Sequence, residues 1–406
     1  MVIRRLADAL WPWRYRAGVL TLCTAVYFGV RLSTALVSAL SPQIVAALGM
    51  SLGAFGFAIT GIRVTAAALQ LPSGILSDRY GERRVILAAV VVAGTGTVLL
   101  ALAPSHGAFL AVAILLGVGG GLYYSPSTAL LDSLYDRTGR AIGVFRTGGQ
   151  VAGIVAPLLV VGFGVRHGWR SALLLAGIPL VPIAVGLLFL VRSAEPLPPT
   201  ASPARRIGTR RVRSILARPP IATSVVLACL VQFVDVASFA LLPAGLQGYH
   251  DLPPGAATAV YGGYFVAGAL GQPVTGWLAD RYGNGPTLVA TLLAGIVGFG
   301  LLSYRLAATA VVGAVCLAGF SRTWATPVQS RILDHLSADE RGTGFGLVRT
   351  VYLLVGALGS AVVGTIATAA GWRVVFGALA GLLATCLAFH VLAIAPDDSP
   401  VGGRAG

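Results

Sequence analysis

Long apolar stretches, each ended by charged residues or turn formers, run through almost the whole chain. A helix that crosses a bilayer needs about 20 predominantly apolar residues, and these stretches have that length. Twelve of them are predicted as transmembrane helices: 17–39, 52–72, 85–103, 107–130, 141–163, 171–192, 221–247, 257–277, 286–304, 307–330, 342–367 and 372–395. The pattern therefore predicts an all-α membrane protein.

The sixth and seventh helices are separated by residues 193–220, a segment rich in Pro and Arg. We expect an N-terminal six-helix bundle (1–192), a cytoplasmic basic linker (193–220) and a C-terminal six-helix bundle (221–406). The halves share motifs: Gly74-Ile-Leu-Ser-Asp-Arg-Tyr-Gly81 returns as Gly276-Trp-Leu-Ala-Asp-Arg-Tyr-Gly283, and Gly168-Trp-Arg170 returns as Gly371-Trp-Arg373. Parallel repeats of this kind predict two pseudo-symmetric bundles of a transporter.

Composition narrows the class of protein. Hydrophobic residues make up 56% of the chain and charged residues 11%, with a mean hydropathy of +0.84, whereas a soluble domain carries about 25% charged residues. All 29 basic residues are Arg. The chain therefore has neither the phosphate-binding Lys of a Walker A loop nor a Schiff-base Lys, which argues against an ATPase and a retinal protein.

The net charge of +15 is explained by membrane topology. When Arg192 and Arg373, at the ends of predicted helices, are counted with the adjoining loops, 20 Arg lie on the side that holds both termini and the linker, and 4 lie on the other side. Arg gathers on the cytoplasmic side of membrane proteins. We predict a multi-pass protein of a prokaryotic-type plasma membrane with both termini cytoplasmic, whose partners are the lipid bilayer, a small-molecule substrate and protons, and not nucleic acid.

Sequence motifs typical of catalytic and metal sites are missing from the chain. The four cysteines, Cys23, Cys229, Cys316 and Cys386, lie singly in apolar stretches without His or Cys at ligand spacing. The chain has no G-x-S-x-G, no H-E-x-x-H and no lysine nucleophile. We therefore expect no metal, no cofactor and no enzymatic activity.

The segment after the second predicted helix matches a known signature. The pattern G-x-L-x-D-R-x-G-x-R-R is matched by Gly74, Leu76, Asp78, Arg79, Gly81, Arg83 and Arg84. Its second copy, with Asp280 and Arg281, lacks the trailing basic pair. With twelve helices and a basic central linker, the chain resembles the major facilitator superfamily (MFS) over essentially its whole length. The resemblance implies a rocker-switch secondary active transporter, usually a monomer, driven by a solute or proton gradient.

The same resemblance implies a conformational latch in the signature. Asp78 is expected to cap the start of the eleventh helix near Thr343 in the outward-facing state, and Arg83 or Arg84 to pair with Asp132. The alternative is that these charges only fix the membrane topology.

Charged residues within the predicted helices are the functional candidates, because an intramembrane charge costs roughly 2.5–3.5 kcal/mol. They are Arg31, Arg63, Arg146, Arg322 and Arg349, with Asp235 as the one clearly intramembrane acid. The roles of three of these Arg stay open. Arg146 and Arg349 either snorkel, pair with Asp132 and Asp334, or bind substrate, and Arg63 either joins the cavity or braces the eleventh helix.

Polar residues of the first predicted helix recur at helical spacing and form one stripe, which we expect to face a cavity: Thr24, Tyr27, Arg31, Thr34 and Ser38. Gln232, Asp235 and Ser238 form the counterpart in the seventh helix. Asp235 lies two positions from the repeat equivalent of Arg31, so we expect the two side chains to face each other across a central cavity. Protonation of Asp235 would then release Arg31 to bind an anion. The alternative is a permanent ion pair.

Two further helices contribute expected cavity residues. Arg322 lies at helical spacing with Thr326 and Gln329 in the tenth helix, and Tyr123 and Tyr124 lie in the fourth. The predicted substrate-binding residues are Arg31, Tyr27, Asp235, Gln232, Arg322 and Tyr123, and Asp235 is also the predicted proton-coupling residue.

The substrate class is less sharply indicated. The segment Tyr27-Phe-Gly-Val-Arg31 is similar to the first helix of organophosphate:phosphate antiporters, but Asp235 departs from the second Arg that those proteins have in the seventh helix. Gly149, Gly153 and Pro157 loosely resemble the Gly-Pro motif of drug:proton antiporters. We expect proton-coupled transport of a small solute, and the excess of intramembrane Arg favours an organic anion such as a carboxylate. The alternatives are proton-driven efflux of lipophilic compounds and a sensor that binds solute without moving it.

Overall fold

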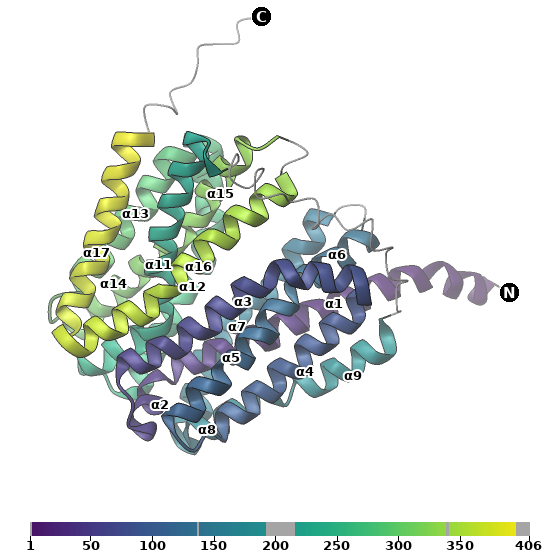
Figure 1. Ribbon diagram of the computed structural model, residues 1–406, viewed down its shortest axis with the longest axis horizontal. Helices are drawn as coiled ribbons and strands as arrows, with labels where there is room; N and C mark the ends of the chain where they lie inside the picture. Colours follow the sequence, from purple (N-terminus) through teal and green to yellow (C-terminus); the bar gives the residue numbers. More distant parts are fainter. Residues whose placement is uncertain (1, 136–137, 192–215, 338–340, 395–406) are drawn as a thin grey trace, which may run out of the picture. The chain divides into compact units, whose positions relative to one another are not determined.

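The computed structural model describes residues 2–135, 138–191, 216–337 and 341–394, and helices make up nearly all of them (Figure 1). The chain divides into two compact units. Unit 1 consists of Met1–Met50 and Phe57–Arg206, and unit 2 of Ser51–Gly56 and Ile207–Gly406. Most of the predicted linker lies outside the described residues, so the predicted domain bounds stay predictions.

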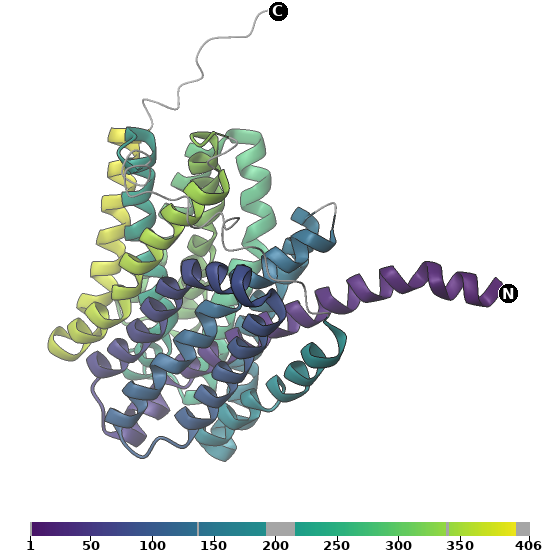
Figure 2. The same cartoon turned by 45° about the vertical axis from the view of Figure 1, so that its right-hand side comes forward.

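Unit 1 holds the first helices of the chain, and α1 spans 38 residues (Figure 2). Its elements are α1 (Val2–Ala39), α2 (Ser41–Leu48), α3 (Leu52–Tyr80), α4 (Glu82–Ala101), α5 (His106–Leu122), α6 (Tyr124–Leu134), α7 (Thr138–Leu159), the π-helix η1 (Val160–Gly164), α8 (Val165–Gly177) and α9 (Leu180–Leu190). The first turn of α3 belongs to unit 2.

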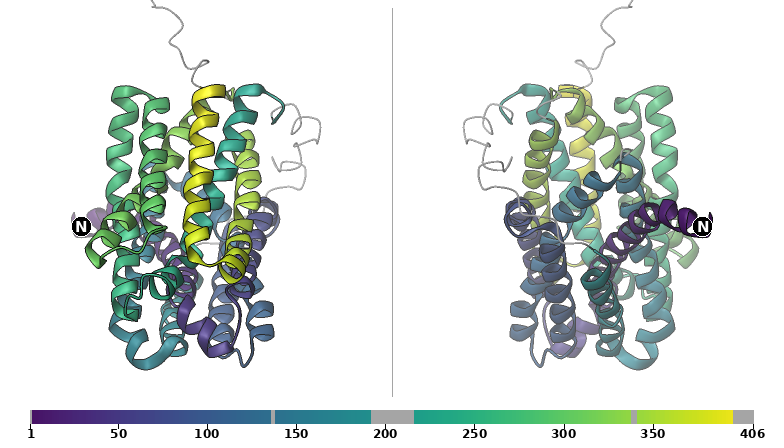
Figure 3. Two further views of the ribbon diagram at one scale, coloured as in Figure 1. Left: turned by 90° about the vertical axis from the view of Figure 1, so that its left-hand side faces the viewer. Right: turned by 90° about the vertical axis from the view of Figure 1, so that its right-hand side faces the viewer.

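Unit 2 repeats the arrangement, and α17 lies beside α11 (Figure 3). Its elements are α11 (Pro219–Gly248), α12 (Pro254–Tyr282), α13 (Asn284–Leu302), α14 (Ala308–Ser321), the 3-10 helix η3 (Arg322–Trp324), α15 (Ala325–Asp334), α16 (Arg341–Ala370), α17 (Trp372–Phe389) and the π-helix η4 (His390–Ile394).

The described helices are long enough for twelve crossings. Ten stretches are long and apolar enough to span a membrane. One of them, Arg140–Leu190, is 51 residues long, about twice what a bilayer requires, and its helix is interrupted at Gly168. It therefore supplies two crossings, and α12, with 29 residues, supplies the twelfth. The predicted twelve-helix, all-α fold is confirmed.

The fourth and tenth predicted helices, 107–130 and 307–330, are not continuous in the structure. The first breaks at Tyr123, between α5 and α6, and the second breaks at η3, between α14 and α15. A proline follows each break, Pro126 in α6 and Pro327 in α15. Proline has no N–H to donate to the carbonyl four residues earlier, and its ring clashes with that carbonyl. The two prolines therefore explain breaks at corresponding places in the two units.

Glycines allow close helix packing in both units. A Cβ on Gly119 of α5 would lie 2.6 Å from the Ala93 side chain of α4, and one on Gly298 of α13 would lie 2.7 Å from the Ala314 carbonyl of α14. Small residues let backbones approach in a membrane, where packing replaces the hydrophobic effect as the force between helices. These contacts hold each unit together.

The repeated motifs form the same turns in both units. Gly81 and Gly283 have φ of 85° and 88°, and Gly168 and Gly371 have φ of 83° and 81°. The accompanying ψ values of 146° to 172° place them in or beside a region that is almost exclusive to glycine. Each motif glycine therefore ends one helix and lets the next begin.

Replacing a turn glycine by alanine tests this account. Gly371→Ala forces a Cβ into a backbone conformation that costs on the order of 1–3 kcal/mol, so we expect a lower Tm of the purified protein in detergent. Gly377→Ala is the matched control, since Gly377 lies in α17 with open space around a Cβ and no positive φ. An equal Tm for both variants would contradict the assigned role of Gly371.

Candidate functional site

An ion pair between α11 and η3 is the centre of the polar site in unit 2. The Arg322 Nε donates to Asp235 Oδ1 at 2.8 Å, and the two side chains are 20% and 21% exposed. Both residues lie within apolar stretches that are long enough to cross a membrane. Pairing offsets the cost of placing each charge there.

Neighbouring side chains hold both members of the pair. Gln232, one turn before Asp235 in α11, donates from Nε2 to Asp235 Oδ2 at 3.5 Å. The guanidinium of Arg322 lies 4.9 Å from the ring centroids of both Tyr264 and Phe265 in α12. An aromatic face attracts a cation at this range. Arg322 is therefore bound by a carboxylate and by two rings.

Local sequence explains why Arg322 meets these rings. A Cβ on Gly268 of α12 would lie 3.2 Å from the Gly319 carbonyl of α14, close to the side chain of Arg322. Gly319 itself lies against the backbone of Tyr264. Two facing glycines thus bring α12 against the end of α14, and the break before Pro327 begins at Arg322.

Polar contacts continue along α15 from the ion pair. Thr326 Oγ1 donates to Gln272 Oε1 of α12 at 3.2 Å, and Gln329 Nε2 donates to Tyr352 Oη of α16 at 3.3 Å. The predicted row of Arg322, Thr326 and Gln329 therefore makes polar contacts with three different helices of unit 2. Its role in lining a cavity stays a prediction.

Unit 1 contains a group of four aromatic residues, which we call the tyrosine cluster: Tyr27, Tyr123, Tyr124 and Phe145. Tyr27 of α1 stacks on Phe145 of α7 at 4.9 Å between ring centroids, and its centroid lies 5.4 Å from Tyr123 and 6.1 Å from Tyr124. A Cβ on Gly149 would overlap the ring of Tyr27. Glycine at this position makes the arrangement possible.

Two Arg flank the tyrosine cluster. The Arg146 Nε donates to Tyr124 Oη at 3.1 Å, and the Arg31 guanidinium lies 5.9 Å from the centroid of Tyr27. The structure thus places the predicted residues Arg31, Tyr27 and Tyr123 together. Among the described residues, neither Arg forms a salt bridge with an acid.

The pairing of Asp235 with Arg322 was not among the contacts that the sequence predicted. Asp235 pairs with Arg322 inside unit 2, whereas the predicted pairing with Arg31 joins two units and stays a prediction. Asp235 and Arg322 are 87 residues apart, and no spacing rule connects them. The available signal was the shortage of acid, since one intramembrane carboxylate faced five candidate Arg.

The structure shows contacts for three Arg of the two signature copies. Arg83 donates to the carbonyl of Leu188 near the end of α9, where a cation complements the helix dipole. Arg79 lies over Tyr80 at 5.2 Å and Arg281 lies over Trp277 at 5.7 Å.

The remaining signature roles stay predictions. The side chain of Thr343, the expected partner of Asp78, lies outside the described residues. The pairing of Arg83 or Arg84 with Asp132 stays a prediction, as do the roles of Gly74 and Asp280.

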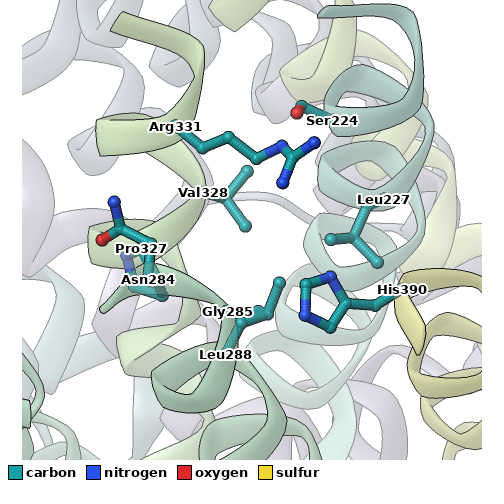
Figure 4. Close-up of a pocket in the computed structure, with 9 residues that line it drawn as sticks. All are labelled: Ser224, Leu227, Asn284, Gly285, Leu288, Pro327, Val328, Arg331 and His390. Atoms are coloured by element: carbon teal, nitrogen blue, oxygen red, sulfur yellow. The ribbon is translucent and has the colours of Figure 1, made fainter. Parts of the chain in front are cut away.

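A small cavity lies between α11, α13, α15 and η4 (Figure 4). Its volume is about 10 Å³, room for one water-sized molecule and too little for an organic solute. Arg331 and His390 point toward it and are only 7% and 2% exposed. The sequence assigned Arg331 to a loop, and its burial in α15 was missed. Among the described residues no group of three potential metal-binding side chains is present.

Breaking the ion pair should expose its energetic role. Arg322→Gln leaves Asp235 without its counterion at a cost of roughly 3 kcal/mol, so we expect a clear fall in Tm. The double variant Arg322→Gln with Asp235→Asn removes both charges and should recover most of the loss. Additive losses in the double variant would show that the two charges do not stabilise each other.

Comparison with known proteins identifies the family. The family model described as Major Facilitator Superfamily matches residues 23–250 and 226–405. The 4-hydroxybenzoate transporter PcaK of Pseudomonas aeruginosa is 31% identical over 223 residues, 53% of this chain and 47% of that protein. This match thus spans about half the length of that relative.

Two longer matches cover more of both chains. Monocarboxylate transporter 13 of Rattus norvegicus is 27% identical over 296 residues, 70% of this chain and 67% of that protein. A probable 4-methylmuconolactone transporter of Cupriavidus pinatubonensis is 27% identical over 343 residues, 79% of this chain and 76% of that protein.

Solved structures confirm the fold. A bacterial homologue of the human lysosomal transporter Spinster superposes with a TM-score of 0.79 at 18% identity, covering 93% of this chain and 97% of that chain. The nucleoside transporter NupG gives a TM-score of 0.75 at 14% identity, with coverage of 93% and 98%. Since the family model matches well over half of the chain, this multi-pass membrane protein belongs to the Major Facilitator Superfamily of transporters.

Proposed function

We propose that the protein is a proton-coupled secondary transporter of organic anions that works by alternating access. The observation that carries the proposal is the pair of Asp235 and Arg322, a 2.8 Å ion pair within the membrane-spanning helices that is still about one-fifth exposed. One titratable acid holds one permanent cation. Proton binding and anion binding are therefore linked through the same pair.

The coupling follows from electrostatics. While Asp235 is ionised, its carboxylate occupies Arg322 and an anion meets a neutralised site. A proton on Asp235 removes most of that attraction, so the guanidinium is released to donate to the carboxylate of a substrate. When substrate leaves, Asp235 gives up its proton and binds Arg322 again. In this scheme Arg322 takes the role that the sequence assigned to Arg31, and Gln232 orients Asp235.

Relatives support an anionic substrate. Among the matched proteins are transporters named for 4-hydroxybenzoate and monocarboxylates and a probable sulfoacetate transporter of Cupriavidus necator. Each of these names describes an anion or a class of anions. These relatives share their family and fold with this chain. The excess of intramembrane Arg is the physical reason to propose an anionic substrate for this chain too.

Efflux of lipophilic compounds is the second candidate. A fujikurins efflux protein of Gibberella fujikuroi is 29% identical over 136 residues, 33% of this chain. In that case Asp235 would bind a proton and a lipophilic cation in turn. The pairing with Arg322 favours the anion transporter, because a cationic substrate would have to displace a guanidinium that also contacts two rings.

The proposed setting is a plasma membrane with both termini in the cytoplasm and a monomeric transporter. The distribution of Arg outside the helices supports this orientation. The proposed driving force is then the proton gradient across that membrane.

Neutralising the proposed proton site should uncouple transport. We expect Asp235→Asn in proteoliposomes to lose uptake of radiolabelled 4-hydroxybenzoate driven by a pH gradient, while exchange of external for internal anion persists. Asp251→Asn is the matched control: Asp251 lies outside the spanning helices in a 69% exposed pair with Arg305, and its uptake should be unchanged. Unaltered dependence on the pH gradient in Asp235→Asn would overturn the coupling role.

The signature acid should control the conformational cycle. If Asp78 latches the outward-facing state, Asp78→Asn abolishes uptake at normal amounts in the membrane. Glu82→Gln removes the same charge from the first turn of α4, four residues further along, and should retain uptake. Equal uptake by the two variants, measured at matched expression, would support the topological role of the signature instead.

A further inference from the structure

The rings of the tyrosine cluster lie at the distances at which aromatic rings bind one another. Tyr27, Tyr124 and Phe145 lie within 4.9 to 6.1 Å of one another by ring centroid, the range in which aromatic rings attract each other through stacked and edge contacts. These rings come from α1, α6 and α7, so three helices converge on them. A further aromatic ring would meet favourable faces and edges here.

The tyrosine cluster has two buried rings and two that are partly exposed. Phe145 is fully buried and Tyr123 is 4% exposed, whereas Tyr27 and Tyr124 are half-buried. The buried rings hold the accessible ones in place. Close packing against Gly149 fixes Tyr27 further, so the surface offered to a ligand is preorganised.

A cation that pairs with no acid of the described residues lies beside the accessible ring. Arg31 is half-buried in a membrane-spanning helix, and its guanidinium lies 5.9 Å from the centroid of the Tyr27 ring. In the described part of the chain no acid forms a salt bridge with it. An isolated guanidinium at membrane depth is costly, and an anionic ligand lowers that cost through charge-assisted hydrogen bonds.

We propose that unit 1 has an anion site of its own, in addition to the site that protonation of Asp235 opens at Arg322. The transported substrate is an aromatic carboxylate, whose ring binds at Tyr27 and Tyr124 and whose carboxylate binds Arg31. The inference rests on the proposed anion transport and makes its substrate class specific. An aliphatic carboxylate of similar size satisfies Arg31 equally well but gains less from the rings. The rings therefore give the preference for aromatic over aliphatic carboxylates, and Arg31 gives the requirement for an anion.

Arg146 takes a positioning role in this site. Its Nε donates to Tyr124 Oη at 3.1 Å, which fixes the ring that the substrate meets. Packing among the aromatic residues is the competing explanation for the whole group. The two explanations differ in one measurable property, the preference for an aromatic over a saturated ring.

The experiment compares benzoate with cyclohexanecarboxylate, two anions of equal charge and similar size. Each competes with radiolabelled 4-hydroxybenzoate for uptake driven by a pH gradient into proteoliposomes. In the wild-type protein we expect benzoate to compete about 3- to 10-fold more strongly, the ratio that an added aromatic pair provides. Tyr27→Phe keeps a ring and should keep the ratio, whereas Tyr27→Leu should bring it close to 1.

The outcomes separate this inference from the proposed function. Uptake that depends on the pH gradient but shows equal competition by both anions in the wild-type protein leaves anion transport standing and overturns the aromatic site. A ratio that survives Tyr27→Leu overturns the site as well. Absence of gradient-driven uptake for every anion tested, with correctly folded protein, overturns the proposed function itself.

Discussion

A charge within a bilayer must be paired, hydrated or bound to a ligand, and this constraint connects the fold of the protein with its proposed activity. Asp235 and Arg322 satisfy it by pairing at 2.8 Å, with aromatic faces on the guanidinium. Arg31 satisfies it differently, beside Tyr27 and without an acid among the described residues. The described part of the chain thus has an Arg that is neutralised by an acid, Arg322, and an Arg that is not, Arg31. In the proposed scheme, protonation of Asp235 frees Arg322 to bind an anion as well.

The fold places these residues through small features of backbone chemistry. Prolines at 126 and 327 interrupt the helices that carry Tyr123 and Arg322, and glycines at 149 and 268 leave room for the aromatic rings and the guanidinium beside them. The breaks lie at corresponding places in the two related units. The duplicated helix bundle therefore carries a different chemical group at each break, a tyrosine in unit 1 and an arginine in unit 2.

Periodicity and repetition predicted most of the fold, and side-chain contacts were harder to predict. Twelve helices follow from the lengths of apolar stretches, and the turn glycines follow from motifs that return in the second half. The partner of Asp235 did not follow, because repeat symmetry pointed to Arg31 while the contact with Arg322 depends on how α11 and η3 pack. Burial of Arg331 was missed for the same reason: a residue at a helix end is exposed or buried according to its neighbours.

In the proposed mechanism, the protein binds an anion and Asp235 takes up a proton in the same step. Proton uptake by the purified protein on addition of benzoate, followed with a pH-indicator dye in weakly buffered detergent solution, tests it most directly. The account predicts uptake of protons in the wild-type protein and none in Asp235→Asn, although the variant still binds benzoate. Benzoate binding without proton uptake in the wild-type protein, or equal uptake in the variant, would contradict it.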